Sequence, residues 1–281
     1  MSDMTQAIPD IPGLPLPLSG ETRLHVIIGD PIAQAGSPRL FNQAFRRRGA
    51  GAVLVPLHVR SEHLSQALAA LRHFGNVDGI VVTVPHKIAV MELIDEVRDS
   101  GRRIGAVNAI RRLPDGRLVG DNFDGKGCIR GLSAAGHGIQ GKSVLIVGGG
   151  GAGRAVAHAM ADEGPSRLRL FDIDSTRQAE LVASLAQAHP GLVVEVGAAD
   201  PQGFDVVVNC TPLGMQASDP YPVDPERISP SALVVDVILK PAISPLLEAA
   251  AKRGCATQPG IRMLEGQVEA ICDFFGVGMP A

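Results

Sequence analysis

Residues 143–153 read Ser-Val-Leu-Ile-Val-Gly-Gly-Gly-Gly-Ala-Gly, and this stretch decides the fold. The apolar residues predict a buried strand, and a helix is predicted from Gly151 to about Asp162. Between them, Gly148, Gly150 and Gly153 match the G-x-G-x-x-G pattern. Outside a strand–loop–helix context such a run would be only a flexible glycine turn. In that context it predicts a loop whose backbone approaches a pyrophosphate at a helix N-terminus.

The residue that ends the next predicted strand bears on the choice of dinucleotide. Asp172 lies 19 residues beyond Gly153, where an acid hydrogen-bonds the ribose diol of NAD. A carboxylate there would repel the 2′-phosphate of NADP, and an NADP enzyme would more often place an arginine at or just after this point. Asp174 follows, and Arg177 already lies inside the next predicted helix. We therefore expect NAD as the preferred cofactor, with NADP possible.

Outward from the glycine loop, short β-branched runs alternate with helical stretches, which predicts an α/β fold with helix-covered parallel sheets. Ser61 and Ser175 are each expected to cap a helix. Strands are predicted at residues 24–28, 52–57, 78–84, 143–147, 167–171, 192–196, 205–209 and 233–237, and a hairpin at 106–111 and 117–119. Helices are predicted at residues 38–48, 61–74, 151–162, 175–188 and 262–275.

This pattern predicts two domains and an N-terminal arm. The Pro-rich residues 1–22 are expected to form a flexible, extended arm. Residues 23–124 are expected to form an α/β substrate and catalytic domain, to which the last helix returns with residues 260–281. Residues 125–259 are expected to form an NAD-binding Rossmann domain with a parallel sheet.

Composition narrows the class of protein. The 281 residues carry a net charge of −3 and no basic block, which does not favour nucleic acid as a partner. No apolar run approaches the roughly 20 residues of a membrane span, and the first 20 residues do not resemble a signal peptide. The cysteines lack CxxC spacing and flanking histidines, so we expect reduced thiols, no metal site and a cytoplasmic location. They are Cys128, Cys210, Cys255 and Cys272.

Three polar residues lie in or just after short apolar strands on the N-terminal side of the loop. Lys87 ends Thr83-Val84-Pro85-His86-Lys87, Asn108 lies in the first strand of the predicted hairpin, and Asp124 follows that hairpin. A lysine beside an aspartate can move a proton on and off an alcohol oxygen, and the loop downstream suggests what accepts the hydride. Taken singly, Lys87 reads as a solvated surface lysine and Asp124 as a turn residue; together they predict a dehydrogenase.

From about Arg23 to Phe275 the chain resembles the shikimate/quinate dehydrogenase family. The resemblance implies a cleft between two domains and reversible hydride transfer between a ring alcohol, such as shikimate, quinate or a related cyclic hydroxy acid, and NAD(P). Its motifs are Gly29-Asp30-Pro31-Ile32 with Ser37-Pro38, Thr83–Lys87, Ala106-Val107-Asn108, Asn122-Phe123-Asp124-Gly125, the glycine loop, Asn209–Met215 and Gly260–Gln267.

By position, the resemblance assigns roles to individual residues. Lys87 and Asp124 match the catalytic pair. A turn or cap role for Asn108 and a solvent-facing place for Gln267 are alternatives to substrate binding. The residues that match substrate ligands are Ser37, Thr83, Asn108 and Gln267. The cofactor set is Gly148, Gly150, Gly151, Ala152, Gly153, Asp172, Asn209, Thr211 and Gly260.

Four positions depart from the family's pattern, because apolar residues replace its usual polar ligands. They are Ala35, Val81, Phe123 and Leu239. Each lost polar contact is worth about 0.5–1.5 kcal/mol, so shikimate recognition is expected to be altered, and Phe123 is expected to reshape the pocket. Shikimate, quinate, an amino analogue or a less polar cyclic alcohol all remain candidate substrates for a monomeric or homodimeric enzyme. The alternatives are a dinucleotide-binding sensor with little turnover and a folate dehydrogenase of similar architecture.

Overall fold

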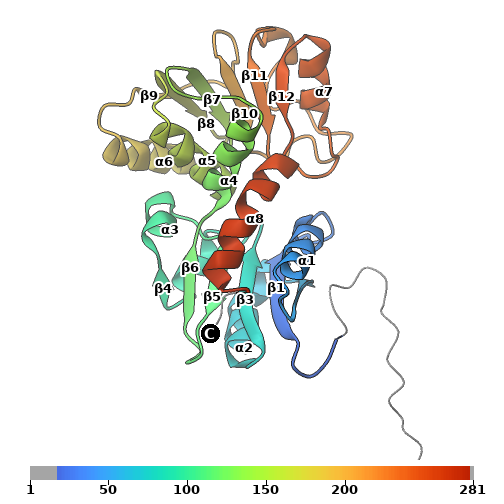
Figure 1. Cartoon of the computed structure of the whole chain (residues 1–281). Helices are drawn as coiled ribbons and strands as arrows, with labels where there is room; N and C mark the ends of the chain where they lie inside the picture. Colours follow the sequence, from blue (N-terminus) through green and yellow to red (C-terminus); the bar gives the residue numbers. More distant parts are fainter. Residues whose placement is uncertain (1–17, 279–281) are drawn as a thin grey trace, which may run out of the picture.

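Two six-stranded sheets with flanking helices build residues 18–278, the part of the chain that this computed structural model describes (Figure 1). The strand order is β2-β1-β3-β5-β6-β4 in the first sheet and β12-β11-β10-β7-β8-β9 in the second. The predicted α/β class is therefore confirmed. Of the predicted arm, residues 1–17 lie outside the described residues, and residues 18–22 form a turn before the first strand.

The first sheet is mixed, because it contains parallel and antiparallel strand pairs, and its edge strand β4 pairs in parallel with β6. β1 pairs in parallel with β2 and β3, whereas β5 pairs antiparallel with both β3 and β6. The predicted hairpin thus extends the parallel part. Its strands are β1 (Arg23–Gly29), β2 (Ala52–His58), β3 (Val77–Val82), β4 (Glu96–Val97), β5 (Ala109–Arg112) and β6 (Leu118–Asp121). Its helices are α1 (Ser37–Arg47), α2 (Leu64–His73) and α3 (Asp99–Ile104).

Every strand pair of the second sheet is parallel, as expected for the Rossmann type. Its strands are β7 (Ser143–Val147), β8 (Arg167–Phe171), β9 (Val194–Val196), β10 (Val206–Asn209), β11 (Leu233–Asp236) and β12 (Ala256–Gln258). Its helices are α5 (Gly151–Asp162), α6 (Ser175–Ala188) and α7 (Pro245–Lys252). The predicted boundary at residue 124 falls between the strands of the two sheets, and the folding of two separate domains stays a prediction.

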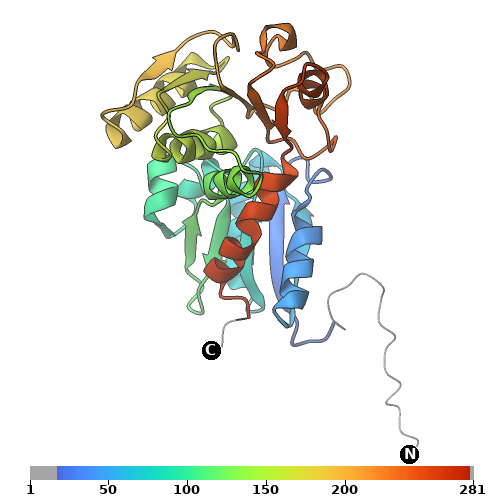
Figure 2. The ribbon, with the colours of Figure 1, turned by 45° about the horizontal axis from the view of Figure 1, so that its top comes forward.

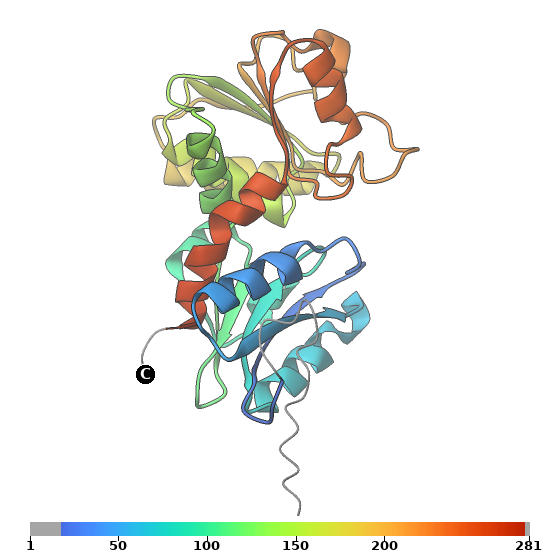
Figure 3. The ribbon, with the colours of Figure 1, turned by 45° about the vertical axis from the view of Figure 1, so that its right-hand side comes forward.

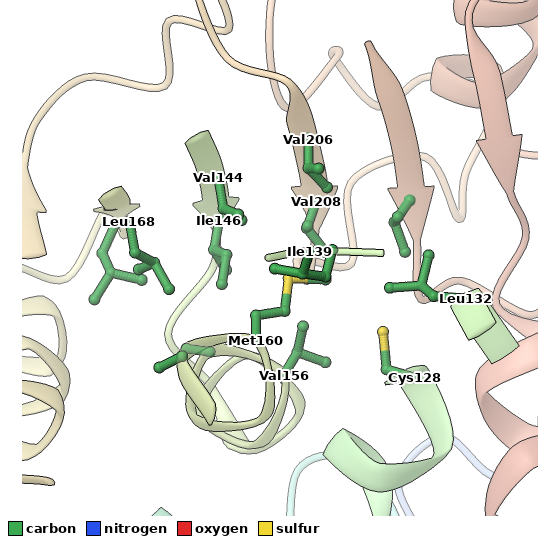
Figure 4. Close-up of a cluster of buried hydrophobic side chains, with 14 of the residues drawn as sticks. Cys128, Leu132, Ile139, Val144, Ile146, Val156, Met160, Leu168, Val206 and Val208 are labelled. Atoms are coloured by element: carbon green, nitrogen blue, oxygen red, sulfur yellow. The ribbon is translucent and has the colours of Figure 1, made fainter. Parts of the chain in front are cut away.

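Alternation along the strands gives the second sheet a core on each face. Val144 and Ile146 of β7 join one buried cluster, and Leu145 and Val147 join another, because successive strand side chains point to opposite faces. Figure 4 shows the first cluster, in which Val144 and Ile146 point toward Met160 of α5. A strand buried on both faces must be apolar throughout, which is why β7 was readable from sequence.

Two helices cross between the sheets and were predicted incompletely. α8 (Ile261–Phe275) runs from the second sheet down to the first, beside α1, as expected (Figures 2 and 3). α4 (Asp124–Ala134) was not predicted. Its glycines disfavour a helix in isolation but allow close packing: a Cβ on Gly125 would lie 2.3 Å from Ala155 O, and one on Gly127 would lie 2.3 Å from Met263 O.

Both predicted helix caps were wrong. Ser61 begins a short 3₁₀ turn, Ser61–His63, which has no side-chain cap, and α2 follows it. Ser175 is already the first residue of α6, and the cap is Asp174, whose carboxylate accepts hydrogen bonds from the backbone N–H groups of Thr176 and Arg177. A carboxylate there also complements the positive end of the helix dipole.

Candidate active site

A cavity of about 130 Å³ opens where the first sheet, α8 and the glycine loop meet. Most of its wall is apolar, with contributions from β1, β3, α1 and α8. Every predicted catalytic and substrate-binding residue lies in this wall. These residues, which are also its polar members, are Ser37, Thr83, Lys87, Asn108, Asp124 and Gln267.

A buried ion pair forms the polar centre of the cavity. Lys87 Nζ donates to Asp124 Oδ2 at 2.5 Å, and the two residues are 8% and 2% exposed. The surface-lysine and turn-residue interpretations are therefore wrong. A buried charge requires a partner, because removing the partner leaves an ion without solvation. The arrangement places a proton donor and acceptor, coupled to each other, in the cavity wall.

Asn108 links this pair to α8. Its Nδ2 donates to Asp124 Oδ1 at 2.9 Å and to Gln267 Oε1 at 2.6 Å, while its Oδ1 accepts from the N–H of Phe123 at 2.9 Å. Asn108 thus also holds the residue before α4. This contact is not a helix cap, because α4 has no side-chain cap hydrogen bond, so the cap role considered from the sequence is wrong. Gln267 is buried at 4% exposure, so a solvent-facing place for it is wrong.

Local backbone structure fixes the aspartate. Asp124 is the first residue of α4, where the helix dipole favours a negative charge. Its N–H donates to Asn122 Oδ1 at 3.0 Å, and Asn122 Nδ2 donates to Ala106 O at 3.1 Å. Asn122 is a positioning residue that the sequence reasoning did not single out. The signal available was its place two residues before Asp124 in a run that leaves a buried strand.

The four apolar replacements fall into two groups. Val81 and Leu239 line the cavity. Phe123 instead packs into the core on Phe274, with ring centroids 5.4 Å apart, and Ala35 packs against the same core. The expectation that Phe123 reshapes the pocket is therefore wrong, because α8 offers its ring an aromatic partner away from the cavity.

The glycine loop has the geometry of a phosphate cradle. Gly148 has φ +102°, and a Cβ on Gly153 would lie 1.9 Å from Gly148 O, so only glycine fits at Gly153. A Cβ on Gly150, in contrast, would meet nothing within 4 Å. The first turn of α5 leaves backbone N–H groups without helical partners, which an anion can accept. Ala152 in this turn lines the cavity, so the loop suits a dinucleotide reaching the buried ion pair.

Asp172 holds the glycine loop in place through hydrogen bonds to backbone N–H groups. Its Oδ2 accepts from the N–H of Gly149 at 2.6 Å, and its Oδ1 accepts from the N–H of Asp174 at 2.8 Å and from Arg177 at 3.4 Å. The next residue, Ile173, is 93% exposed. A carboxylate has about four acceptor positions, so a ribose hydroxyl can be added to these contacts. The sequence alone did not indicate that Asp172 also shapes the loop.

The other predicted cofactor residues lie at strand ends of the second sheet: Asn209 ends β10, Thr211 follows it, and Gly260 follows β12. Asn209 Nδ2 donates to both carboxylate oxygens of Asp236 at 3.2 Å, and its Oδ1 accepts from Thr211 Oγ1 at 2.6 Å. Burial raises the pKa of Asp236, while hydrogen bonds from Ser244, Ile238 and Asn209 act in the opposite direction. Gly260 is packed against strand-end backbone, since a Cβ there would lie 2.5 Å from Ile238 O. Their contact with a cofactor stays a prediction.

Other kinds of site find less support in residues 18–278. No group of three or more His, Cys, Asp or Glu side chains is placed to hold a metal ion. The four cysteines are free, and burial raises the pKa of Cys128 and of Cys272 to about 12. No helix in this part of the chain is both long and apolar enough to cross a membrane.

Comparisons with known proteins identify relatives of this chain. Residues 27–110 match the family model described as the shikimate dehydrogenase substrate binding domain. A shikimate dehydrogenase (NADP(+)) of Rhodospirillum rubrum is 38% identical over 257 residues, covering 88% of this chain and 89% of the relative. The structure of shikimate dehydrogenase from Aquifex aeolicus has a TM-score of 0.83 at 31% identity, covering 94% of this chain and 96% of that one.

Two further similar structures are named for other activities. Quinate dehydrogenase from Corynebacterium glutamicum, in complex with NAD, has a TM-score of 0.79 at 29% identity, covering 92% of this chain and 94% of that one. A 5-ketofructose reductase of Gluconobacter sp. strain CHM43 has a TM-score of 0.77 at 26% identity, covering 90% and 92%.

Proposed function

This chain belongs to the shikimate dehydrogenase family, and from that premise we propose that it catalyses reversible hydride transfer between a ring alcohol and NAD(P), with NAD preferred. The observation that carries the proposal is the buried Lys87–Asp124 pair in a cavity that the first turn of the glycine-loop helix also lines. A dinucleotide bound there supplies a nicotinamide ring that accepts or donates the hydride.

The protein's own residues handle the proton. In the direction of oxidation, the alcohol proton passes to the amine of Lys87 as hydride leaves carbon; in the reverse direction the ammonium group donates a proton to the carbonyl oxygen. Asp124 orients Lys87 through the 2.5 Å contact. Asn108 and Gln267 present amide groups to hydroxyls on the ring, and their mutual hydrogen bond of 2.6 Å holds both in place.

The preference for NAD rests on the end of β8. Asp172 and Asp174 put two carboxylates at and just after the end of β8, where this fold type binds the adenosine ribose, and the side chain of Ile173 between them offers a 2′-phosphate no donor. Arg177, the nearest cation in this region, already contacts both acids. Relatives named NADP enzymes reach 39% identity to this chain, whereas the quinate dehydrogenase structure holds NAD. Repulsion between the acids and a 2′-phosphate favours NAD in this chain.

The substrate is proposed to be a cyclic alcohol less dependent on carboxylate recognition than shikimate. Val81 and Leu239 stand in the cavity wall where the family's pattern has polar groups, and Ser37 is the hydroxyl left at the carboxylate end. Lys87 is the one cationic side chain in this wall, and it is paired with Asp124. A reductase of 5-ketofructose with the same fold supports the idea that this cavity type accepts other polyols.

One experiment tests the activity and its lysine. Purified protein is assayed with NAD and with NADP against shikimate, quinate and neutral cyclic polyols, and Lys87→Ala is assayed beside it. We expect NADH formation with at least one ring alcohol, and loss of turnover in Lys87→Ala with NAD binding retained. Full activity in Lys87→Ala would rule out its assigned role. Tight ligand binding with no reduced cofactor from any substrate would favour the sensor alternative, which the apolar cavity wall motivates.

A further inference from the structure

A second cavity, of about 410 Å³, lies at the other end of the first sheet. Three arginines and one aspartate line it: Arg23, Arg111, Arg112 and Asp78. Phe275 and Gly276, at the end of α8, form another side. It shares no lining residue with the catalytic cavity. Along β1, Arg23 of this cavity and Ile27 of the catalytic cavity are four residues apart, or about 13 Å.

The three arginines of this second cavity, called the arginine pocket below, differ in whether an acidic side chain neutralises them. Arg23 is neutralised by Asp78, to which its Nε donates at 2.8 Å and its Nη2 makes a second, shorter contact. Arg111 and Arg112 have no ion-pair partner within residues 18–278. Among the described residues, the pocket therefore carries two positive charges that no acidic side chain neutralises.

Backbone contacts hold these two guanidinium groups in position. Arg112 Nε donates to Arg72 O at 2.7 Å, and Arg111 Nη1 donates to Phe274 O at 3.4 Å. Both arginines are half-buried. Carbonyl contacts orient a guanidinium without cancelling its charge, which leaves its remaining N–H donors for an anion.

We propose that the arginine pocket binds a small organic polyanion, of the polycarboxylate or phosphate-ester class. The volume lies in the range of small-molecule sites, and guanidinium groups match carboxylate and phosphate oxygens through paired hydrogen bonds. The site also joins two elements of the catalytic cavity. β5, which carries Arg111 and Arg112, directly follows Asn108, and α8, which closes the pocket, carries Gln267. A ligand that bridges β5 and the end of α8 stabilises the arrangement of these two elements, and with it the positions of the Asn108 and Gln267 amides.

The glycine at the pocket's edge allows a test that leaves the arginines intact. A Cβ on Gly75 would meet nothing within 4 Å, and its φ is not positive, so a side chain fits there. Gly75→Asp adds a negative charge to the pocket, and Gly75→Asn is its neutral, equally shaped control. Calorimetric titration of the full chain with citrate and with glucose 6-phosphate, at constant ionic strength, measures binding.

We expect at least one of the two probes to bind the wild-type protein at millimolar concentration or below, and the one that binds identifies the anion class. Gly75→Asp should weaken that binding at least tenfold, and Gly75→Asn should change it little. Arg111→Gln should also weaken it, whereas Arg117→Gln, an exposed arginine already paired with Asp115 on the same hairpin, should not. No binding of either probe, or equal losses in Gly75→Asp and Gly75→Asn, would overturn the proposal.

Discussion

The side chain of Lys87 packs directly on Gly151, because a Cβ built at this glycine would lie 2.8 Å from Lys87 Cβ. Lys87 and the glycine loop are therefore one packed unit, although 64 positions separate Lys87 from Gly151 in the sequence. Under the proposed function, this contact would bring the reacting end of a dinucleotide near the proton donor. The small side chains of the loop would then be part of the geometry of catalysis.

Two glycine variants separate these roles. Gly151→Ala should displace Lys87 and lower kcat, because a 2.8 Å carbon contact forces one of the two groups to move. Gly150→Ala meets nothing in the protein, so it should leave stability unchanged while weakening dinucleotide binding, since its methyl group faces the phosphates. Steady-state kinetics and fluorescence titration with NADH distinguish the two. Equal effects of both variants on kcat would contradict the assignment.

Asp124→Asn should preserve the fold and lose turnover. An amide can offer its oxygen to Asn108 or to Lys87 but not to both, so an N–H donor would face one of these donors. Loss of the carboxylate should lower kcat by roughly 10²–10⁴-fold, the usual share of a positioned acid–base group. NADH binding is the control, because the glycine loop is unchanged. Wild-type kcat in this variant would exclude Asp124 from the proton path.

Ile173→Arg should shift the cofactor preference toward NADP. The side chain is 93% exposed at the end of β8, so an arginine there costs little stability. A charge-assisted hydrogen bond to the 2′-phosphate is worth about 1.5–3 kcal/mol, which corresponds to roughly tenfold or more in the NADP to NAD ratio of kcat/KM. Ile173→Gln, of similar reach without the charge, is the matched control. A wild-type protein that already favours NADP would refute the proposed preference.

Val81→Asn should raise activity with shikimate relative to neutral ring alcohols. Val81 is 6% exposed on β3 and lines the cavity, so an amide there returns a polar group to the substrate wall. One such contact contributes about 0.5–1.5 kcal/mol, or roughly 2- to 12-fold in KM. Val81→Ala controls for the change in volume. If both variants alter the shikimate KM alike, polarity at this position does not set specificity.

His25 should make the protein less stable as pH falls. Its ring is 1% exposed between Phe45 and Phe275, and its two nitrogens find no hydrogen-bond partner within residues 18–278. Burial lowers its pKa from 6.5 to about 4. Between pH 6.5 and pH 4 the unfolded chain binds a proton at His25 that the folded chain does not. The free energy of unfolding is therefore at its full value above pH 6.5 and decreases as pH falls toward 4. The loss reaches about 3 kcal/mol.

Urea unfolding at pH 7 and at pH 5 measures this effect, with His25→Leu beside the wild-type protein. The substitution removes the titrating group, so the variant should lose less stability than the wild type over the same interval. His158, whose pKa burial also lowers to about 4, contributes equally in both proteins. An identical pH dependence in the two proteins would show that His25 does not titrate in this way.

The sequence alone determined those parts of the protein whose signals are local. Each of these signals spans only one turn or one strand of the chain. They are the apolar run of β7, the glycine spacing before α5 and the alternation of strands with helices. This is why the α/β fold and the dinucleotide loop were predictable. Lys87, Asn108 and Asp124 were indicated by their places beside predicted strands. The other polar residues of the cavity could be named only through resemblance to a family, because no local pattern brings Asn108 to Gln267, 159 positions away.

Only the tertiary structure decided which side chains face the cavity and which face the core. Phe123 turns to Phe274 rather than to the substrate site, and α4 exists despite its glycines because Gly125 and Gly127 let α5 and α8 approach within contact distance. The arginine pocket likewise forms only where the ends of β1, β5 and α8 meet. Helix propensity and strand alternation are encoded over a few neighbouring residues, whereas burial and charge pairing depend on which distant segments the fold brings together.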